Sequence, residues 1–242
     1  VEYETFLKSG GICPNSISFY MRGLRAVYNR AVEKELTVQR NPFRHVYTGI
    51  DKTVKRAVPA KVIRQIRDLD LTPDPAMDLA RDLFMFSFYT RGMSFIDMAF
   101  LKKSDLKNGI LSYRRQKTGQ QLFIRWEKPM QEIVDKYDTT GTPYLLPVIR
   151  DTTKDARRQY KNAEHLTNGR LKRIGKRLGL EIPLTTYVAR HGWASIAKSK
   201  NIPVATISEA MGHDSEKTTR IYLASLDTSV VDKANNLVIK SL

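Results

Sequence analysis

Two arginines lie where a bound anion is expected. Arg91 stands beside a glycine in TRGMS, between two hydrophobic stretches, and a buried arginine without a counter-charge is costly. Arg190 lies in YVARHGWAS near the start of a predicted helix, where it shares a face with Tyr187 by i, i+3 spacing and where the helix dipole attracts an anion. The segments indicate recognition of a negatively charged group. The alternatives are an ion pair of Arg91 with Asp97 or Asp82 and, for the helix, an aromatic core contact.

Two further segments carry a lysine, a histidine and a tyrosine. Lys117 lies at the predicted tip of a β-hairpin in RRQKTG, where it could reach into a groove. His213 follows a helix-ending glycine in MGHD, and Tyr222 comes nine residues later in RIY. Taken one at a time, Lys117 could equally be an exposed turn residue and Tyr222 a core residue.

Together, in this order along the chain, the four segments resemble the motifs of the tyrosine site-specific recombinases, also called phage-type integrases. The resemblance covers about residues 60–230. It implies breakage and rejoining of DNA strands without a metal, ATP or any other cofactor. The catalytic residues that it implies are Arg91, Lys117, Tyr187, Arg190, His213 and Tyr222.

The resemblance also implies a role for each catalytic residue. Tyr222 is the nucleophile, and its attack on phosphorus leaves a 3′-phosphotyrosyl enzyme and a free 5′-hydroxyl. Arg91 and Arg190 clamp the phosphate oxygens, because guanidinium groups bind them bidentately and stay charged. His213 donates a further hydrogen bond to the phosphate. Lys117 is the general acid that protonates the leaving oxygen.

One position departs from the pattern of the family. Tyr187 stands where the family usually has the first histidine of H-x-x-R. A phenol can donate or accept a hydrogen bond, but it cannot become a cationic imidazole. We therefore expect Tyr187 to bind the phosphate through a hydrogen bond or to support Tyr222.

The charge of the chain favours a polyanionic partner, double-stranded DNA. The chain has 41 Lys and Arg against 25 Asp and Glu, a net charge of +16 at pH 7. Basic stretches are spread along it, and between residues 154 and 177 basic side chains outnumber acidic ones by nine to two, which is typical of a folded nucleic-acid-binding protein. The side chains expected to bind DNA are Arg22, Arg25, Arg30, Arg114, Arg115, Arg170, Lys172 and Arg173.

The composition argues against several other classes of protein. Cys13 is the one cysteine in the sequence, so neither an intramolecular disulfide framework nor a multi-cysteine zinc site can form. No apolar run approaches the roughly 18 residues that span a bilayer, and the N-terminus is unlike a signal peptide. We expect a cytoplasmic protein associated with the bacterial nucleoid.

The periodicity predicts a mainly α-helical fold with a small antiparallel β-sheet (α+β). Apolar residues recur at helical spacing over 16–36, and a nearly all-apolar helix over 76–89 is expected to be buried. Two strands flank the turn QKTG between 109 and 126. Basic helices are predicted over 154–165 and 168–178.

The resemblance also predicts the domain organisation. Residues 1–50 resemble the C-terminal part of a helical core-binding (SAM-like) domain, whose front part is expected to be missing from this chain. Residues 51–60 form a linker, and 61–242 form the integrase-type catalytic domain with a tail helix near 230–239. The family implies a homotetramer on synapsed DNA sites, a Holliday junction and exchange of the tail helix between protomers. The expected outcome is integration or excision of a mobile element.

Three other functions stay open from the sequence. A type IB topoisomerase uses the same chemistry to relax DNA without pairing two sites. A non-catalytic DNA-binding module would have similar charge and similar amphipathic helices. A metal-dependent nuclease could use Asp68, Asp70 and Asp74, although their place beside a proline-rich turn better suits a loop and a helix start.

Overall fold

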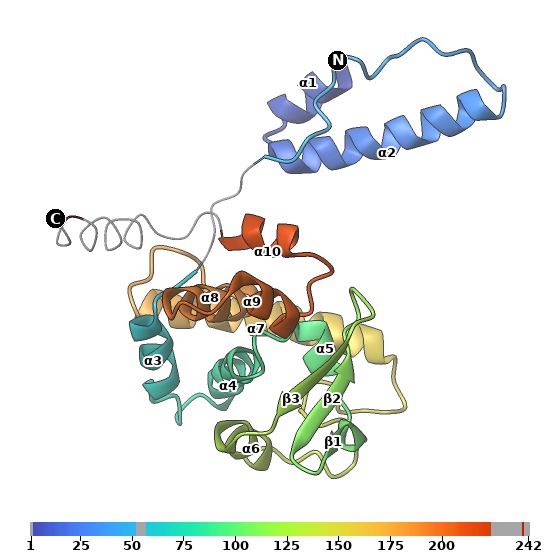
Figure 1. Cartoon of the computed structure of the whole chain (residues 1–242). Helices are drawn as coiled ribbons and strands as arrows, with labels where there is room; N and C mark the ends of the chain where they lie inside the picture. Colours follow the sequence, from blue (N-terminus) through green and yellow to red (C-terminus); the bar gives the residue numbers. More distant parts are fainter. Residues whose placement is uncertain (1, 52–56, 224–238, 240–242) are drawn as a thin grey trace. The chain divides into compact units, whose positions relative to one another are not determined.

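The computed structural model describes residues 2–51, 57–223 and 239. For Lys217, Ile221 and Tyr222, only the backbone is described. The chain divides into two compact units, Val1–Val54 and Lys55–Leu242, and each unit is described by itself (Figure 1). The assignment of the first unit to a core-binding domain stays a prediction.

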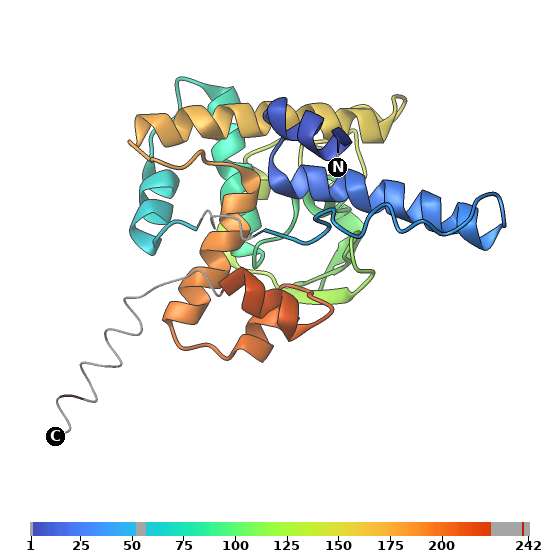
Figure 2. The ribbon, with the colours of Figure 1, turned by 90° about the horizontal axis from the view of Figure 1, so that it is seen from above.

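The first unit consists of two helices and a returning segment. Helix α1 (Glu2–Ser9) precedes α2 (Pro14–Glu33), which begins with a proline at its first turn. Leu7, Ile17 and Met21 form a small core with Val46. The chain after α2 runs back along it (Figures 1 and 2). Its far end is held by Asn15, whose side chain bonds to both backbone groups of residue 51, at 3.1 and 2.8 Å.

The core of the second unit is built around α4 (Pro75–Tyr89). Asp74 caps this helix by accepting a hydrogen bond from Met77 N, and most of its residues are buried, as the nearly all-apolar sequence predicts. Helix α4 contacts α3 (Ala60–Asp68), α6 (Lys128–Asp135), α7 (Ala156–Arg177) and α8 (Thr186–Ser199). A short helix, α5 (Phe95–Ala99), follows α4 after a tight turn.

The sheet has three antiparallel strands in the order β1-β2-β3. Strands β2 (Ile110–Arg114) and β3 (Gln121–Arg125) form the predicted hairpin, and the two-residue β1 (Leu106–Lys107), which follows the 3₁₀ turn η1 (Lys103–Asp105), pairs with β2. Burial alternates along β2 and β3, so one face of the sheet packs on the core. The mainly helical fold with a small antiparallel sheet is thereby confirmed.

One prediction of the helix pattern is wrong. The two basic helices expected over 154–165 and 168–178 are a single helix, α7. Asn168 and Gly169 do not break it, because Thr167, Leu171 and Ile174 continue one buried face across this point. The Asn168 side chain instead accepts a hydrogen bond of 2.9 Å from Thr186 N at the start of α8.

Three helices close the described part of the second unit. Helix α8 leads into α9 (Val204–Ala210) and then α10 (Glu216–Leu223). A second hydrophobic cluster joins them, made of Ala194, Ala197, Ile207, Met211 and Leu223. The tail helix predicted near 230–239 lies, apart from position 239, outside the residues that the structure describes. Within the described ranges, every helix is too short or too polar to cross a bilayer.

Candidate active site

The turn after α4 presents Arg91 and brings the chain against α8. Arg91 and Gly92 both have left-handed backbone angles, with φ of 62° and 77°. Gly92 N donates to Ser87 O at 2.7 Å, which closes the end of α4. A Cβ atom at Gly92 would lie 2.7 Å from Cα of Arg190. Glycine is therefore required at this position both for its backbone angle and for its lack of a side chain.

Arg190 joins three segments through one guanidinium. It lies in α8 and is 4 % exposed. Its Nη1 donates to Gly92 O at 2.7 Å, and its Nη2 donates to Met211 O at 2.6 Å. The same Nη2 lies 3.0 Å from Nε2 of His213. The turn after α4, helix α8 and the loop after α9 thus meet at this side chain.

His213 is held as a neutral imidazole of defined tautomer. Burial, together with the positive charges of Arg190, Arg115 and Lys117, lowers the pKa of His213 to about 4. A guanidinium can only donate, so Nε2 accepts from Arg190. The proton is then on Nδ1, which lies 2.7 Å from the hydroxyl of Thr219 in α10.

The β-hairpin reaches the same loop. Arg115 is 7 % exposed, and its Nη1 donates to Gly212 O. The hydroxyl of Thr118 adds a hydrogen bond of 3.3 Å to the same carbonyl. Lys117 lies between them at the tip and is exposed. The bonds of Arg115 and Thr118 to Gly212 place the hairpin tip next to His213, and the Lys117 charge contributes to the low pKa of that histidine.

One buried carboxylate accompanies these cations. Asp97 is 4 % exposed and accepts hydrogen bonds from Gln116 N at 2.9 Å and from the Ser94 hydroxyl at 2.6 Å. Burial and the Asp97 charge raise the pKa of Tyr113, while Arg190, Arg115 and Arg91 oppose the rise. The charges of three arginines and one aspartate therefore act on Tyr113. Their excess positive charge favours a bound anion.

The alternative role of Arg91, an ion pair with Asp97 or Asp82, can be compared with the observed ion pairs. Asp82 pairs with Arg81 and Lys136, and Asp97 is used as above. Within residues 2–51 and 57–223, no ion pair joins Arg91 to either carboxylate. The interpretation of Arg91 as an anion-binding residue therefore stays a prediction that the geometry favours.

The two remaining catalytic candidates are Tyr187 and Tyr222. Tyr187 is 56 % exposed, and its ring meets that of His191 edge-on at 4.7 Å. Arg190 on the next turn is buried. Tyr222 belongs to α10, three residues after Thr219, but its side chain lies outside those that the structure describes.

The predicted DNA-binding residues lie in three places. Arg22, Arg25 and Arg30 are exposed on α2 of the first unit. On α7, Lys172 and Arg173 are exposed and Arg170 is half-buried. In the hairpin the two neighbours differ, because Arg114 is exposed whereas Arg115 is buried in the site. The sequence did not separate these two arginines, since the strand alternation that distinguishes them depends on which face meets the core.

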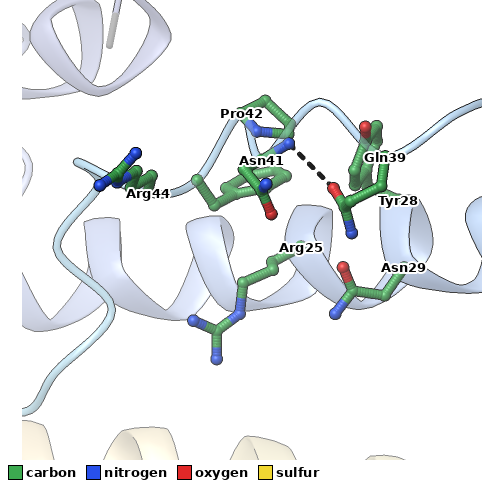
Figure 3. Close-up of a pocket in the computed structure, with 8 residues that line it drawn as sticks. Arg25, Tyr28, Asn29, Gln39, Asn41, Pro42 and Arg44 are labelled. Carbon is green, nitrogen blue, oxygen red and sulfur yellow. Dashed lines mark hydrogen bonds between the residues drawn. The ribbon is translucent and has the colours of Figure 1, made fainter.

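A pocket of about 560 Å³ lies in the first unit, between α2 and the returning segment (Figure 3). Arg25 and Asn29 come from the helix, while Gln39, Asn41 and Arg44 come from the segment. None of its lining residues is acidic, so the pocket suits a polar or anionic ligand. Of these five residues, the sequence predicted only Arg25.

The carboxylates of the nuclease alternative have separate local roles. Asp68 pairs with Arg67 at 2.6 Å, Asp70 accepts from Thr72, and Asp74 caps α4. Among the described residues, no group of three or more potential ligands could hold a metal ion.

Comparison with known proteins gives the class of protein that the sequence motifs predict. The chain is 27 % identical over 223 residues to tyrosine recombinase XerA from Pyrococcus furiosus, covering 89 % of this chain and 72 % of that protein. Its structure is similar to a lambda integrase tetramer bound to a Holliday junction, with a TM-score of 0.67, 17 % identity, and coverage of 90 % and 62 % of the two chains. It is also similar to the Tn1549 transposon integrase in complex with a circular intermediate DNA, with a TM-score of 0.68, 15 % identity, and coverage of 99 % and 83 %.

The fold is that of the tyrosine recombinases. In the second unit, Arg190, His213 and the hairpin that carries Lys117 lie at one site, next to the turn that carries Arg91. The sequence model of the phage integrase family matches residues 57–229. The chain belongs to the phage integrase family.

Proposed function

We propose that this enzyme cleaves and rejoins DNA strands at specific sites through a 3′-phosphotyrosyl intermediate. The observation that carries the proposal is the position of Arg190. Its guanidinium is buried, fixed by two backbone carbonyls and adjacent to His213. A cation held in advance at this point stabilises the charge that develops on a phosphate in the transition state, without having to reorganise.

The phosphate is held by Arg91, Arg190 and His213 in this proposal. In the unliganded site His213 is neutral, because burial and the nearby cations lower its pKa. A bound phosphodiester offsets these positive charges and favours protonation of the imidazole. The protonated Nε2 no longer accepts from Arg190, so it turns from Nη2 and donates to a phosphate oxygen. Tyr187 lies at the N-terminus of α8, where its hydroxyl adds a hydrogen bond to the phosphate or supports Tyr222.

The nucleophile in this proposal is Tyr222. Thr219 lies one helical turn before it in α10 and contacts Nδ1 of His213, so that helix is anchored at the clamp. The Tyr222 hydroxyl gives its proton to solvent as its oxygen attacks phosphorus. The bond from phosphorus to the 5′-oxygen breaks, and Lys117 gives its proton to that oxygen. The energy of the bond is kept in the phosphotyrosine, so rejoining needs no ATP. The arginines supply the charge stabilisation that a metal ion gives in other enzymes of phosphate chemistry.

The assembly and the cellular place follow from the same proposal. The relatives include a tetramer on a Holliday junction and a transposon integrase. We infer that four copies of this chain pair two DNA sites, exchange their C-terminal helices, and integrate or excise a mobile element at the nucleoid. The exposed basic residues of α2 and α7 hold the DNA backbone.

The direct test is covalent trapping. The full chain is incubated with nicked duplexes that contain a randomised 30-base-pair segment, and protein–DNA adducts that survive SDS are isolated and sequenced. We expect adducts with a common sequence for the wild type and none for Tyr222→Phe. Tyr144→Phe is the matched control, because Tyr144 packs edge-on against Phe100 and its ring is kept.

The same experiment separates the alternatives. If the wild type forms no adducts, the proposal is contradicted, and the non-catalytic DNA-binding module is the alternative that remains. Adducts without any pairing of two recovered sites, in a DNA-bridging assay, would instead indicate a topoisomerase. Adducts that form in EDTA exclude the metal-dependent nuclease.

A further inference from the structure

Arg115 closes the hairpin tip with its own backbone. Its N–H donates to Gln120 O at 2.8 Å, and its carbonyl accepts from Gly119 N at 2.8 Å. These two bonds enclose Lys117, so the position of Arg115 determines where the tip begins and ends.

The Arg115 side chain joins this tip to the loop after α9. Its Nη1 donates to Gly212 O, and Thr118 donates to the same carbonyl. Gly212 has a φ of 63°, and a Cβ atom there would lie 3.1 Å from Cδ of Arg115 and 3.0 Å from Cδ1 of Leu122. The hairpin and the loop are therefore in van der Waals contact as well as hydrogen-bonded.

Two successive carbonyls of this loop are each held by an arginine from another element. Met211 O accepts from Arg190 at 2.6 Å, and Gly212 O accepts from Arg115. His213 is the next residue. The backbone that carries the histidine is thus located by helix α8 on one side and by the hairpin on the other.

Holding this loop with Arg115 costs free energy. Its side chain is buried, its Nε has no hydrogen-bond partner in the described part of the chain, and no carboxylate there forms an ion pair with it. Burying a guanidinium without full pairing costs free energy that an apolar residue would not require. This cost argues for a role other than stability.

We propose that Arg115 is a positioning residue that holds the Lys117 hairpin against the His213 loop, so that the proton donor and the phosphate clamp meet at one phosphate. This inference rests on the proposed function. Arg115 does not touch the DNA in this role, which differs from the phosphate contact expected from the sequence. The charge of Arg115 also helps to keep His213 neutral before DNA binds.

The first test needs no DNA. Amide hydrogen exchange is measured on the unliganded full chain for the wild type, Arg115→Met and Lys128→Met. Lys128 is an exposed residue of α6, and its loss removes the same charge. For Arg115→Met we expect faster exchange, by about tenfold or more, at Gln116, Gly119 and His213, and unchanged exchange in α4. Uniform acceleration through the unit, or no local change, would overturn the proposal.

The second test uses the leaving group. A duplex with the recovered cleavage site is made with either oxygen or sulfur at the 5′-bridging position of the scissile phosphate. When the bond from phosphorus to sulfur breaks, the electron pair leaves as a thiolate, which needs no proton because thiols are far more acidic than alcohols. A defect in proton donation is therefore rescued by sulfur, and a defect in phosphate binding is not.

The expected pattern is selective. Lys117→Ala should slow cleavage of the oxygen substrate by about 100-fold or more, and Arg115→Met by about tenfold to 100-fold. On sulfur, Lys117→Ala should approach the wild-type rate, and Arg115→Met should be slowed much less than on oxygen. Arg115→Lys, which keeps the charge and one donor, should recover part of the loss. Lys128→Met should match the wild type on both substrates.

The outcomes distinguish this inference from the proposed function. Equal slowing of Arg115→Met on oxygen and sulfur, or no slowing on either, would overturn the positioning role. If the wild type forms no tyrosyl adduct on either substrate, the proposed function fails, while the exchange experiment still reports whether Arg115 joins the hairpin to the loop.

Discussion

Nη2 of Arg190 lies 3.0 Å from Nε2 of His213, although one side chain comes from α8 and the other from the loop after α9. The contact allows only one arrangement of protons, because arginine cannot accept a hydrogen bond. It makes the histidine dependent on the arginine for both its orientation and its charge.

Replacing Arg190 by lysine should separate chemistry from binding. Lysine keeps the charge but cannot hold the carbonyls of Gly92 and Met211 and face His213 in the same geometry. We expect the rate of adduct formation to fall by about 100-fold or more, with less than a threefold change in Kd for DNA. Quench assays measure the rate of adduct formation, and gel-shift titrations measure Kd. An equal loss of binding and cleavage would contradict the division of the basic residues into clamp and backbone contacts.

The pKa of His213 predicts a pH dependence of stability. The folded value, about 4, lies below the ordinary 6.5, so the unfolded chain binds more protons between these two values. Stability should therefore be complete above about pH 6.5 and should decrease as the pH falls toward 4. Urea unfolding from pH 4 to 7 measures this change. His213→Gln should show a shallower decrease over that range, and an unchanged slope would exclude a neutral buried histidine.

Gly92→Ala should destabilise the second unit more than an equivalent change elsewhere. Both Gly92 and Gly179 have positive φ, of 77° and 66°, but a Cβ atom meets Arg190 only at Gly92. We expect a loss of about 1–2 kcal/mol for Gly179→Ala from the backbone angle alone. The contact at Gly92 should add about 1–3 kcal/mol. Equal free energies of unfolding for the two variants would mean that this turn can move away from α8.

The basic face of α7 should contribute to the salt dependence of DNA binding. Lys172 and Arg173 are exposed there, and each phosphate contact that is lost removes about one unit from the slope of log K against log salt. We expect Lys172→Gln with Arg173→Gln to lower the slope by about 1–2. Lys128→Gln on α6 serves as the control and should leave it unchanged. A slope that stays the same in the double variant would indicate that the DNA does not contact this face of α7.

The local features of the fold were predictable because they depend on neighbours in the chain. The apolar run of α4, the hairpin around Lys117 and the start of α8 follow from side-chain periodicity and turn residues. The single long α7 did not follow, because Asn168 and Gly169 are compatible with a helix end. Only the packing of Leu171 and Ile174 on the core continues the helix through them.

The sequence by itself determined the residue types of the site, their order and the excess of positive charge. These are properties of the chain that need no knowledge of distance. It also determined the family, since the motifs span most of the second unit. The tertiary structure decided which groups meet. It turned Arg115 inward and Arg114 outward, brought Gly92 and Met211 to the guanidinium of Arg190, and made His213 neutral. Such outcomes depend on burial and on contacts between residues about 20 to 100 positions apart, which local patterns do not encode.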